Sequence, residues 1–198
     1  LFAAFYIAVG AMWTGAIAQN IPKAEVRTEQ VQAALLAHAP QGMPIGLQPE
    51  AATGQPVWVG LQFTHAPHWH TYWKNPGDSG QATSLRWTLP AGLQAGDIAW
   101  PVPSKLPVGP LANYGYDGTV LLPVAVTLPE AGAPSGTIKV ELEANWLACK
   151  QECIPQQGKF TLELPAGQPL TADAAAFDAA LQAVPQALPG GNAVLRAS

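Results

Sequence analysis

The sequence carries few charges of either sign. Only 11% of its residues are Asp, Glu, Lys or Arg, compared with about 25% in an average soluble protein. Nine Lys and Arg against thirteen Asp and Glu give a formal net charge of −4, and the basic residues do not cluster. A protein that binds nucleic acid needs a concentrated basic surface to neutralise phosphates. We therefore expect no nucleic-acid partner.

The motifs of several common enzyme classes are also missing. There is no Gly-x-Ser-x-Gly sequence and no glycine-rich phosphate loop, so hydrolase and nucleotide chemistry have no support. Only two cysteines occur among the 198 residues, and no second cysteine pair completes a zinc site of four sulfurs. The residues that can carry chemistry are these two cysteines and a histidine-rich segment.

Apolar and turn-forming residues, by contrast, are abundant. The hydrophobic fraction is 48%, and 19 glycines and 20 prolines are spread along the chain. This composition supports a buried core with many turns and few long helices, in one domain with tails.

The first 18 residues carry no charge and end in Ala16-Ile17-Ala18, a small-x-small pattern. They are typical of the apolar region of a signal peptide whose start is truncated, with the mature chain beginning near Gln19. An uncleaved membrane anchor is the alternative, because a run of this length is just long enough to span a bilayer. Export would place the cysteines in an oxidising compartment.

Alternation of apolar and polar residues predicts strands over residues 57–64, 84–89, 138–146 and 159–164. Residues 119–128 form a further β-prone run, in which Pro123 indicates an edge position or a bulge. Residues 30–37 fit either a strand or a helix, since their alanines and leucines satisfy both periods. Several short strands separated by turns predict an all-β, antiparallel β-sandwich or barrel.

The end of the chain has a different pattern. Thr171 is placed to cap a helix on which Phe177, Leu181 and Val184 share one face, and Pro185 would end it. Residues 189–191 (PGG) are typical of a linker. We expect a short helical tail after the β domain.

The two cysteines, Cys149 and Cys153, lie between the two best-defined strands, at a hairpin connection. The alternation that begins at Ile138 places Ala148 toward the core and Cys149 outward. A stabilising disulfide is one interpretation, although a closed loop of about five residues contributes only about 2 kcal/mol. A redox-active pair is the second interpretation, and a metal site is the third. Lys150 would favour a thiolate and Glu152 would oppose it, so we expect no net shift from this pair.

Three histidines, His65, His68 and His70, share a segment rich in aromatic residues. In one extended strand His68 and His70 would lie on the same face, a half-site for copper or zinc with His65 as a third ligand. The alternative is a strand whose aromatic residues pack in the core while its histidines face solvent.

Three ordered segments resemble a known family. They are residues 70–80 (HTYWKNPGDSG), residues 114–118 (YGYDG) leading into residues 121–124 (LLPV), and residues 149–155 (CKQECIP). Over roughly residues 26–164 the chain resembles the N-terminal periplasmic domain of the thiol:disulfide interchange protein DsbD, closest to the ScsB-like branch associated with copper tolerance.

The resemblance implies an immunoglobulin-like antiparallel β-sandwich and favours a strand over residues 31–36. The expected organisation is a signal-peptide segment (1–18), a β-sandwich domain (19–168) and a helical tail with linker (169–198). The family's larger proteins also carry a transmembrane and a thioredoxin-like domain, so we expect this chain to be a fragment of a membrane protein or a stand-alone module.

The resemblance also implies a site and a function. In the family the second cysteine forms mixed disulfides, so Cys153 would be the nucleophile and Cys149 the resolving thiol. The expected neighbours of the pair are a cap aromatic residue, Tyr114, together with Tyr116, Lys150 and Pro155. The implied activity is periplasmic protein-disulfide reduction, which needs no cofactor and serves cytochrome c biogenesis or copper tolerance.

The implied partners are a membrane-embedded DsbD- or ScsB-type electron-donor domain and exported thioredoxin-fold or other oxidised thiol proteins. The sequence departs from the best-known members in two places. The cysteine spacing is shorter, and Leu111, Ala112 and Asn113 replace the acidic residues before the cap aromatic. A copper-binding module that uses His65, His68 and His70, and a sandwich with a structural disulfide, are the alternative functions.

Overall fold

A computed structural model describes residues 24–42, 57–108, 110–127 and 136–185. In chain order its elements are β1 (Ala24–Arg27), β2 (Val31–His38), β3 (Val57–His65), β4 (Thr71–Gly77), β5 (Ser84–Thr88), β6 (Gln94–Ile98), β7 (Ser104–Val108), β8 (Leu111–Tyr116), β9 (Thr119–Thr127), β10 (Thr137–Cys149), β11 (Cys153–Pro165) and α1 (Ala174–Gln182). The predicted signal peptide and linker lie outside these ranges. Within them, no helix has the length and apolar character needed to cross a bilayer.

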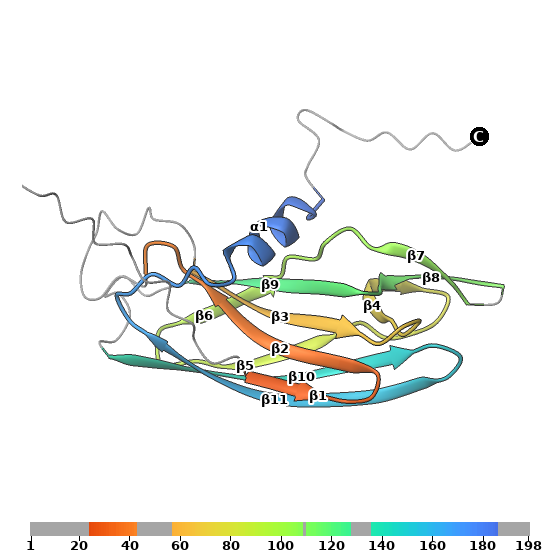
Figure 1. The fold of residues 1–198 in the computed structure, drawn as a ribbon, viewed down its shortest axis with the longest axis horizontal. Helices are drawn as coiled ribbons and strands as arrows, with labels where there is room; N and C mark the ends of the chain where they lie inside the picture. Colours follow the sequence, from red (N-terminus) through yellow and green to blue (C-terminus); the bar gives the residue numbers. More distant parts are fainter. Residues whose placement is uncertain (1–23, 43–56, 109, 128–135, 186–198) are drawn as a thin grey trace, which may run out of the picture.

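The strands form two layers with a third, smaller sheet at one end (Figure 1). One layer is a five-stranded sheet in the order β1-β2-β3-β9-β6, and the other is a three-stranded sheet in the order β11-β10-β5. The end sheet has the order β4-β8-β7. All strand pairs in these sheets are antiparallel. The prediction of an all-β, antiparallel sandwich with a short helical tail is therefore confirmed.

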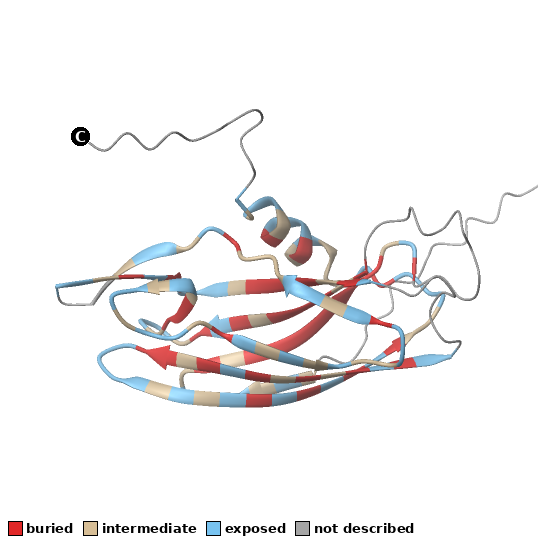
Figure 2. Cartoon of the chain, turned by 180° about the vertical axis from the view of Figure 1, so that it is seen from behind, coloured by how far each residue is buried: buried red, intermediate tan, exposed pale blue. Residues whose placement is uncertain are grey.

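The core lies between the two layers, as the banding of buried positions in Figure 2 shows. Along β10 the residues Ile138, Val140, Leu142, Ala144 and Trp146 are all buried, while the residues between them are half-buried or exposed. Phe63 of β3 packs against Trp146 from the facing layer, with ring centroids 5.2 Å apart. The two-residue alternation read from the sequence thus gives the inward face of this strand correctly.

The five-stranded sheet is covered on its outer face as well. α1 lies across it (Figure 1), and Phe177 and Ala180 of the helix form a second cluster with Ala34, Leu36 and Leu121 of the sheet. Burial on both faces explains why β2 reads as a nearly continuous apolar run. Alternation was uninformative there, and the strand that the family resemblance favoured is confirmed.

Of the two alternatives predicted for Pro123, the edge position is wrong, because β9 lies between β3 and β6. The predicted bulge agrees with the structure, since the register of the β6–β9 pairing shifts beside Pro123. The Pro123 carbonyl accepts from the Ala99 N–H at 2.8 Å, so the side on which proline lacks an N–H faces this interrupted pairing. The predicted start of the helix is wrong. The helix begins at Ala174 after Asp173, rather than at a Thr171 cap, and the Thr171 carbonyl accepts from the Ala174 N–H.

The region around the histidines also differs from the prediction. His65 ends β3 and Thr71 begins β4, so a turn rather than one long strand joins them. His68 sits in this turn with a φ of 69°, which excludes the extended geometry that would place it on one face with His70. The segment that contains Tyr114 is strand β8.

Candidate functional site: a disulfide at the end of a long hairpin

The two cysteines close the longest ladder of the fold. β10 and β11 are 13 residues each and pair along their whole length, and Cys149 and Cys153 are the last partners. They form a disulfide with a Cα–Cα distance of 4.1 Å. In the turn between them, the Lys150 N–H donates to the Glu152 carbonyl at 3.0 Å. The hairpin turn lies at the end of the sandwich that also holds β4, β7 and β8 (Figure 1).

The two sulfur-bearing residues differ sharply in exposure. Cys149 is only 2% exposed, whereas Cys153 is exposed. The prediction that Cys149 faces outward is therefore wrong, although its parity along the strand is as expected. The cause is His70, whose main chain crosses the end of β10 and exchanges two hydrogen bonds of 3.0 Å with the main chain of Cys149. Of the two cysteines, Cys153 is therefore the one accessible from solvent.

A tyrosine and a histidine lie directly behind Cys153. The Tyr72 hydroxyl is 3.8 Å from the Cys153 Sγ and 3.4 Å from the Nε2 of His70. The rings of Tyr72 and His70 meet edge to face, with centroids 5.2 Å apart. Tyr72 is fully buried, and its ring packs against Gly80, where an added Cβ would overlap it.

Burial sets the ionisation of both side chains. Desolvation raises the pKa of Tyr72 above its ordinary value, and a hydrogen bond with Ser79 opposes this shift. Desolvation also lowers the pKa of His70, with the carboxylate of Asp117 acting in the opposite direction. At neutral pH Tyr72 is therefore a phenol and His70 a neutral imidazole.

The other two histidines have separate environments. His65 is buried, with Nδ1 2.8 Å from the Gly118 carbonyl and Nε2 3.0 Å from the Thr71 hydroxyl. Desolvation lowers its pKa, and the Gly118 hydrogen bond opposes this shift. His68 is exposed in its turn. A metal at His65 would have to displace one of two existing hydrogen bonds, and the described residues contain no group of three or more metal-ligating side chains.

The remaining predicted neighbours are distributed around the site. Lys150 is exposed in the hairpin turn, and Pro155 is exposed on β11 opposite Leu147. Tyr114 is 38% exposed on β8, and within the described part of the chain no hydrogen bond or ring contact joins it to the cysteines. Tyr72 was not among the site residues predicted from the sequence. Its position two residues after His70 in a β-prone segment was the available signal.

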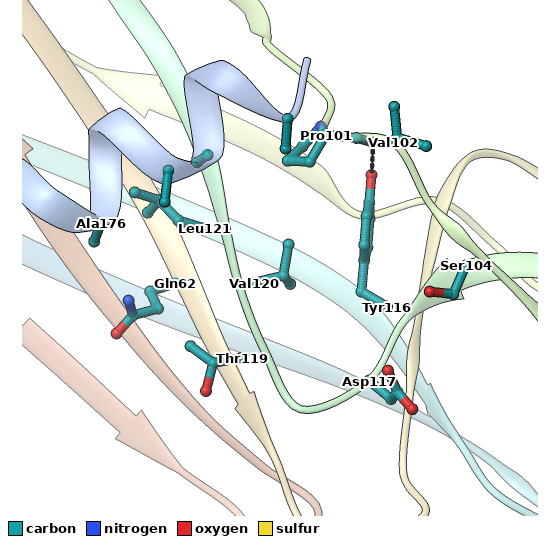
Figure 3. Close-up of a pocket in the computed structure, with 13 residues that line it drawn as sticks. Gln62, Pro101, Val102, Ser104, Tyr116, Asp117, Thr119, Val120, Leu121 and Ala176 are labelled. Carbon is teal, nitrogen blue, oxygen red and sulfur yellow. Dashed lines mark hydrogen bonds between the residues drawn. The ribbon is translucent and has the colours of Figure 1, made fainter. Parts of the chain in front are cut away.

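Tyr116, also predicted as a neighbour, points elsewhere. Its hydroxyl donates to the Pro101 carbonyl at 2.7 Å, and it lines a cavity of about 390 Å³ beneath α1 (Figure 3). Burial raises its pKa. Its polar group is therefore engaged away from the disulfide.

The sandwich fold and the paired cysteines at its tip define a domain class with known relatives. The profile of the family described as "Thiol:disulfide interchange protein DsbD, N-terminal" matches residues 44–165, and the chain belongs to this family. No curated protein sequence matches the chain. Together, the family and the disulfide support a thiol–disulfide interchange module.

A particular relative among solved structures is the N-terminal periplasmic domain of ScsB from Proteus mirabilis. It is 24% identical with a TM-score of 0.56, and the match covers 81% of this chain and 58% of that chain. This likeness shows the immunoglobulin-like fold, and the chain spans little more than half of the relative's length. The GAE domain of yeast GGA1 also matches, at 14% identity, a TM-score of 0.32, and coverage of 71% of this chain and 98% of that one.

Proposed function

We propose that the chain is a periplasmic thiol–disulfide exchange module. It accepts reducing equivalents from a membrane-embedded donor domain and passes them to exported proteins with oxidised thiols. The observation that carries the proposal is the asymmetry of the Cys149–Cys153 pair: one sulfur is open to a partner and the other is held within reach behind it. This is the arrangement that an attacking and a resolving thiol require.

The exchange proceeds in two balanced steps. In the reduced domain the Cys153 thiolate attacks one sulfur of a target disulfide, forming a mixed disulfide and releasing the other target sulfur as a thiolate that takes up a proton. Cys149 then loses its proton and attacks the Cys153 Sγ. The domain disulfide re-forms, and the second target sulfur leaves and is protonated. Two electrons and two protons have moved to the target, and a donor dithiol restores the reduced domain.

The reduction potential of the pair tests this function. Structural disulfides usually lie below about −300 mV, and exchanging pairs lie higher. We expect a value well above that limit when the chain is equilibrated with glutathione or dithiothreitol buffers and its free thiols are counted. A value below the limit would show that the bond is structural.

A trapping experiment tests the roles of the two sulfurs. With oxidised glutathione as the probe, a Cys149→Ser variant should accumulate a mixed disulfide at Cys153, because no resolving thiol remains. The matched Cys153→Ser variant should accumulate little, since Cys149 is buried. Equal trapping by both variants would contradict the assigned roles.

A further inference from the structure

Tyr72 and His70 form a connected path from the reactive sulfur into the protein. The Cys153 Sγ, the Tyr72 hydroxyl and the His70 Nε2 follow one another at 3.8 and 3.4 Å. A hydroxyl can accept one proton and donate another at the same time. The Tyr72 hydroxyl therefore lies between the sulfur of Cys153 and the imidazole base of His70, where it can pass a proton from one to the other.

We propose that Tyr72 and His70 are a proton relay for Cys153, a role that rests on the exchange function proposed above. Tyr72 is the catalytic group, because its hydroxyl contacts the reacting sulfur. His70 acts through Tyr72 as a positioning residue and holds the proton at its Nε2.

In the attacking step the relay moves two protons. As Cys153 attacks the target disulfide, its thiol proton passes to the Tyr72 oxygen, and the Tyr72 hydroxyl proton passes to His70. A sulfur–sulfur bond forms between Cys153 and the target, and the target's own sulfur–sulfur bond breaks with its electron pair on the departing sulfur. That thiolate takes up one proton from solvent, and His70 returns its proton to solvent.

The surroundings keep both groups in the required state. Burial keeps His70 neutral and able to accept, and burial keeps Tyr72 protonated and able to donate. The other titratable groups near His70 are Asp117, whose carboxylate favours the protonated imidazole, and buried His65. The exposed turn beside the disulfide carries the opposite charges of Lys150 and Glu152.

The backbone fixes the relay at both ends. His70 is tied to Cys149 by its two main-chain hydrogen bonds, and Tyr72 bridges to Ala82 on one side while pairing with Gly115 on the other. Gly80 leaves no space for the Tyr72 ring to shift toward it. If Tyr72 only filled space in the core, its packing would not require a hydroxyl next to Cys153.

The test uses the full chain carrying Cys149→Ser, so that Cys153 is the only thiol. The rate of its reaction with oxidised glutathione and the ultraviolet absorbance of its thiolate are both followed against pH. Adding Tyr72→Phe should move both midpoints upward by about one pH unit, with about ten-fold slower reaction below the midpoint. The matched control Tyr116→Phe removes a buried hydroxyl bonded to Pro101 and should leave both midpoints in place.

His70→Gln provides the second variant, and its shift should not add to that of Tyr72→Phe, because His70 acts through the hydroxyl. Unchanged midpoints in Tyr72→Phe, or fully additive shifts in the double variant, would overturn the relay. If the parent does not react with oxidised glutathione at all, the exchange function fails, and the absorbance titration still decides whether Tyr72 and His70 act together on the ionisation of the Cys153 thiol.

Discussion

Gly80→Ala tests how tightly the site is packed around Tyr72. Gly80 has a φ of 99°, and a Cβ there would overlap the Cε1, Cζ and Cδ1 atoms of the Tyr72 ring. Left-handed backbone costs a residue with a side chain about 1–2 kcal/mol, and overpacking a core position adds about 1–3 kcal/mol. We expect the free energy of unfolding to fall by about 2–5 kcal/mol in urea denaturation of the oxidised protein.

Gly136→Ala is the matched control for this substitution. Gly136 has a φ of 93°, and a Cβ there would meet nothing within 4 Å. It should therefore lose only the backbone cost of about 1–2 kcal/mol. The difference between the two variants measures the clash with Tyr72, and a displaced ring should also slow the reaction of Cys153 with oxidised glutathione. Equal destabilisation of the two variants, with unchanged reactivity at Cys153, would refute the packing argument.

Three further predictions concern the stability of the fold. Reduction of the Cys149–Cys153 bond should lower the free energy of unfolding by only about 2 kcal/mol, because the closed loop is short; a loss of more than about 4 kcal/mol in urea with and without reductant would contradict this. Burial lowers the pKa values of His65 and His70 below 6.5, so the unfolded chain binds more protons and stability should fall as the pH drops below that value. A stability profile that is equally steep in a His65→Gln variant would exclude His65 as a source. Phe63→Ala removes a fully buried ring packed on the facing layer and should cost about 3–5 kcal/mol in urea denaturation, whereas a loss under about 1 kcal/mol would show that the core repacks.

The sequence was most informative where one face of a strand is buried and the other is not. The pairing of Ile138 with Leu164 and of Leu142 with Phe160 follows from the alternation in β10 and β11. Strands β6, β7 and β8 were not predicted, since Gly96, Pro107 and Gly115 interrupt any apolar pattern there. The positions of β6 and β8 depend on pairing with β9 and β4, which are distant in sequence, and β7 is held in turn by pairing with β8.

The chemistry of the site was predictable only in part. The cysteine pair and its hairpin followed from local sequence, but the burial of Cys149 did not, because His70, in the segment just before β4, covers it. The contact between Tyr72 and Cys153 joins residues 81 positions apart. No local sequence pattern encodes such a contact. The inward and outward alternation along β10 also cannot predict that the main chain of His70 covers the end of that strand.

The exposure of Cys153 beside the buried Cys149 sets an order of events for the proposed exchange function. In that proposal donor and acceptor both react at Cys153, so the two compete for one atom and do not occupy the hairpin tip together. An exchange module of this kind works as a shuttle with ping-pong kinetics, in which the first partner leaves before the second arrives. The proposed function therefore leaves no direct passage of electrons from donor to acceptor, and it requires the reduced domain to exist between the two encounters as a free species that stores two electrons in its thiols.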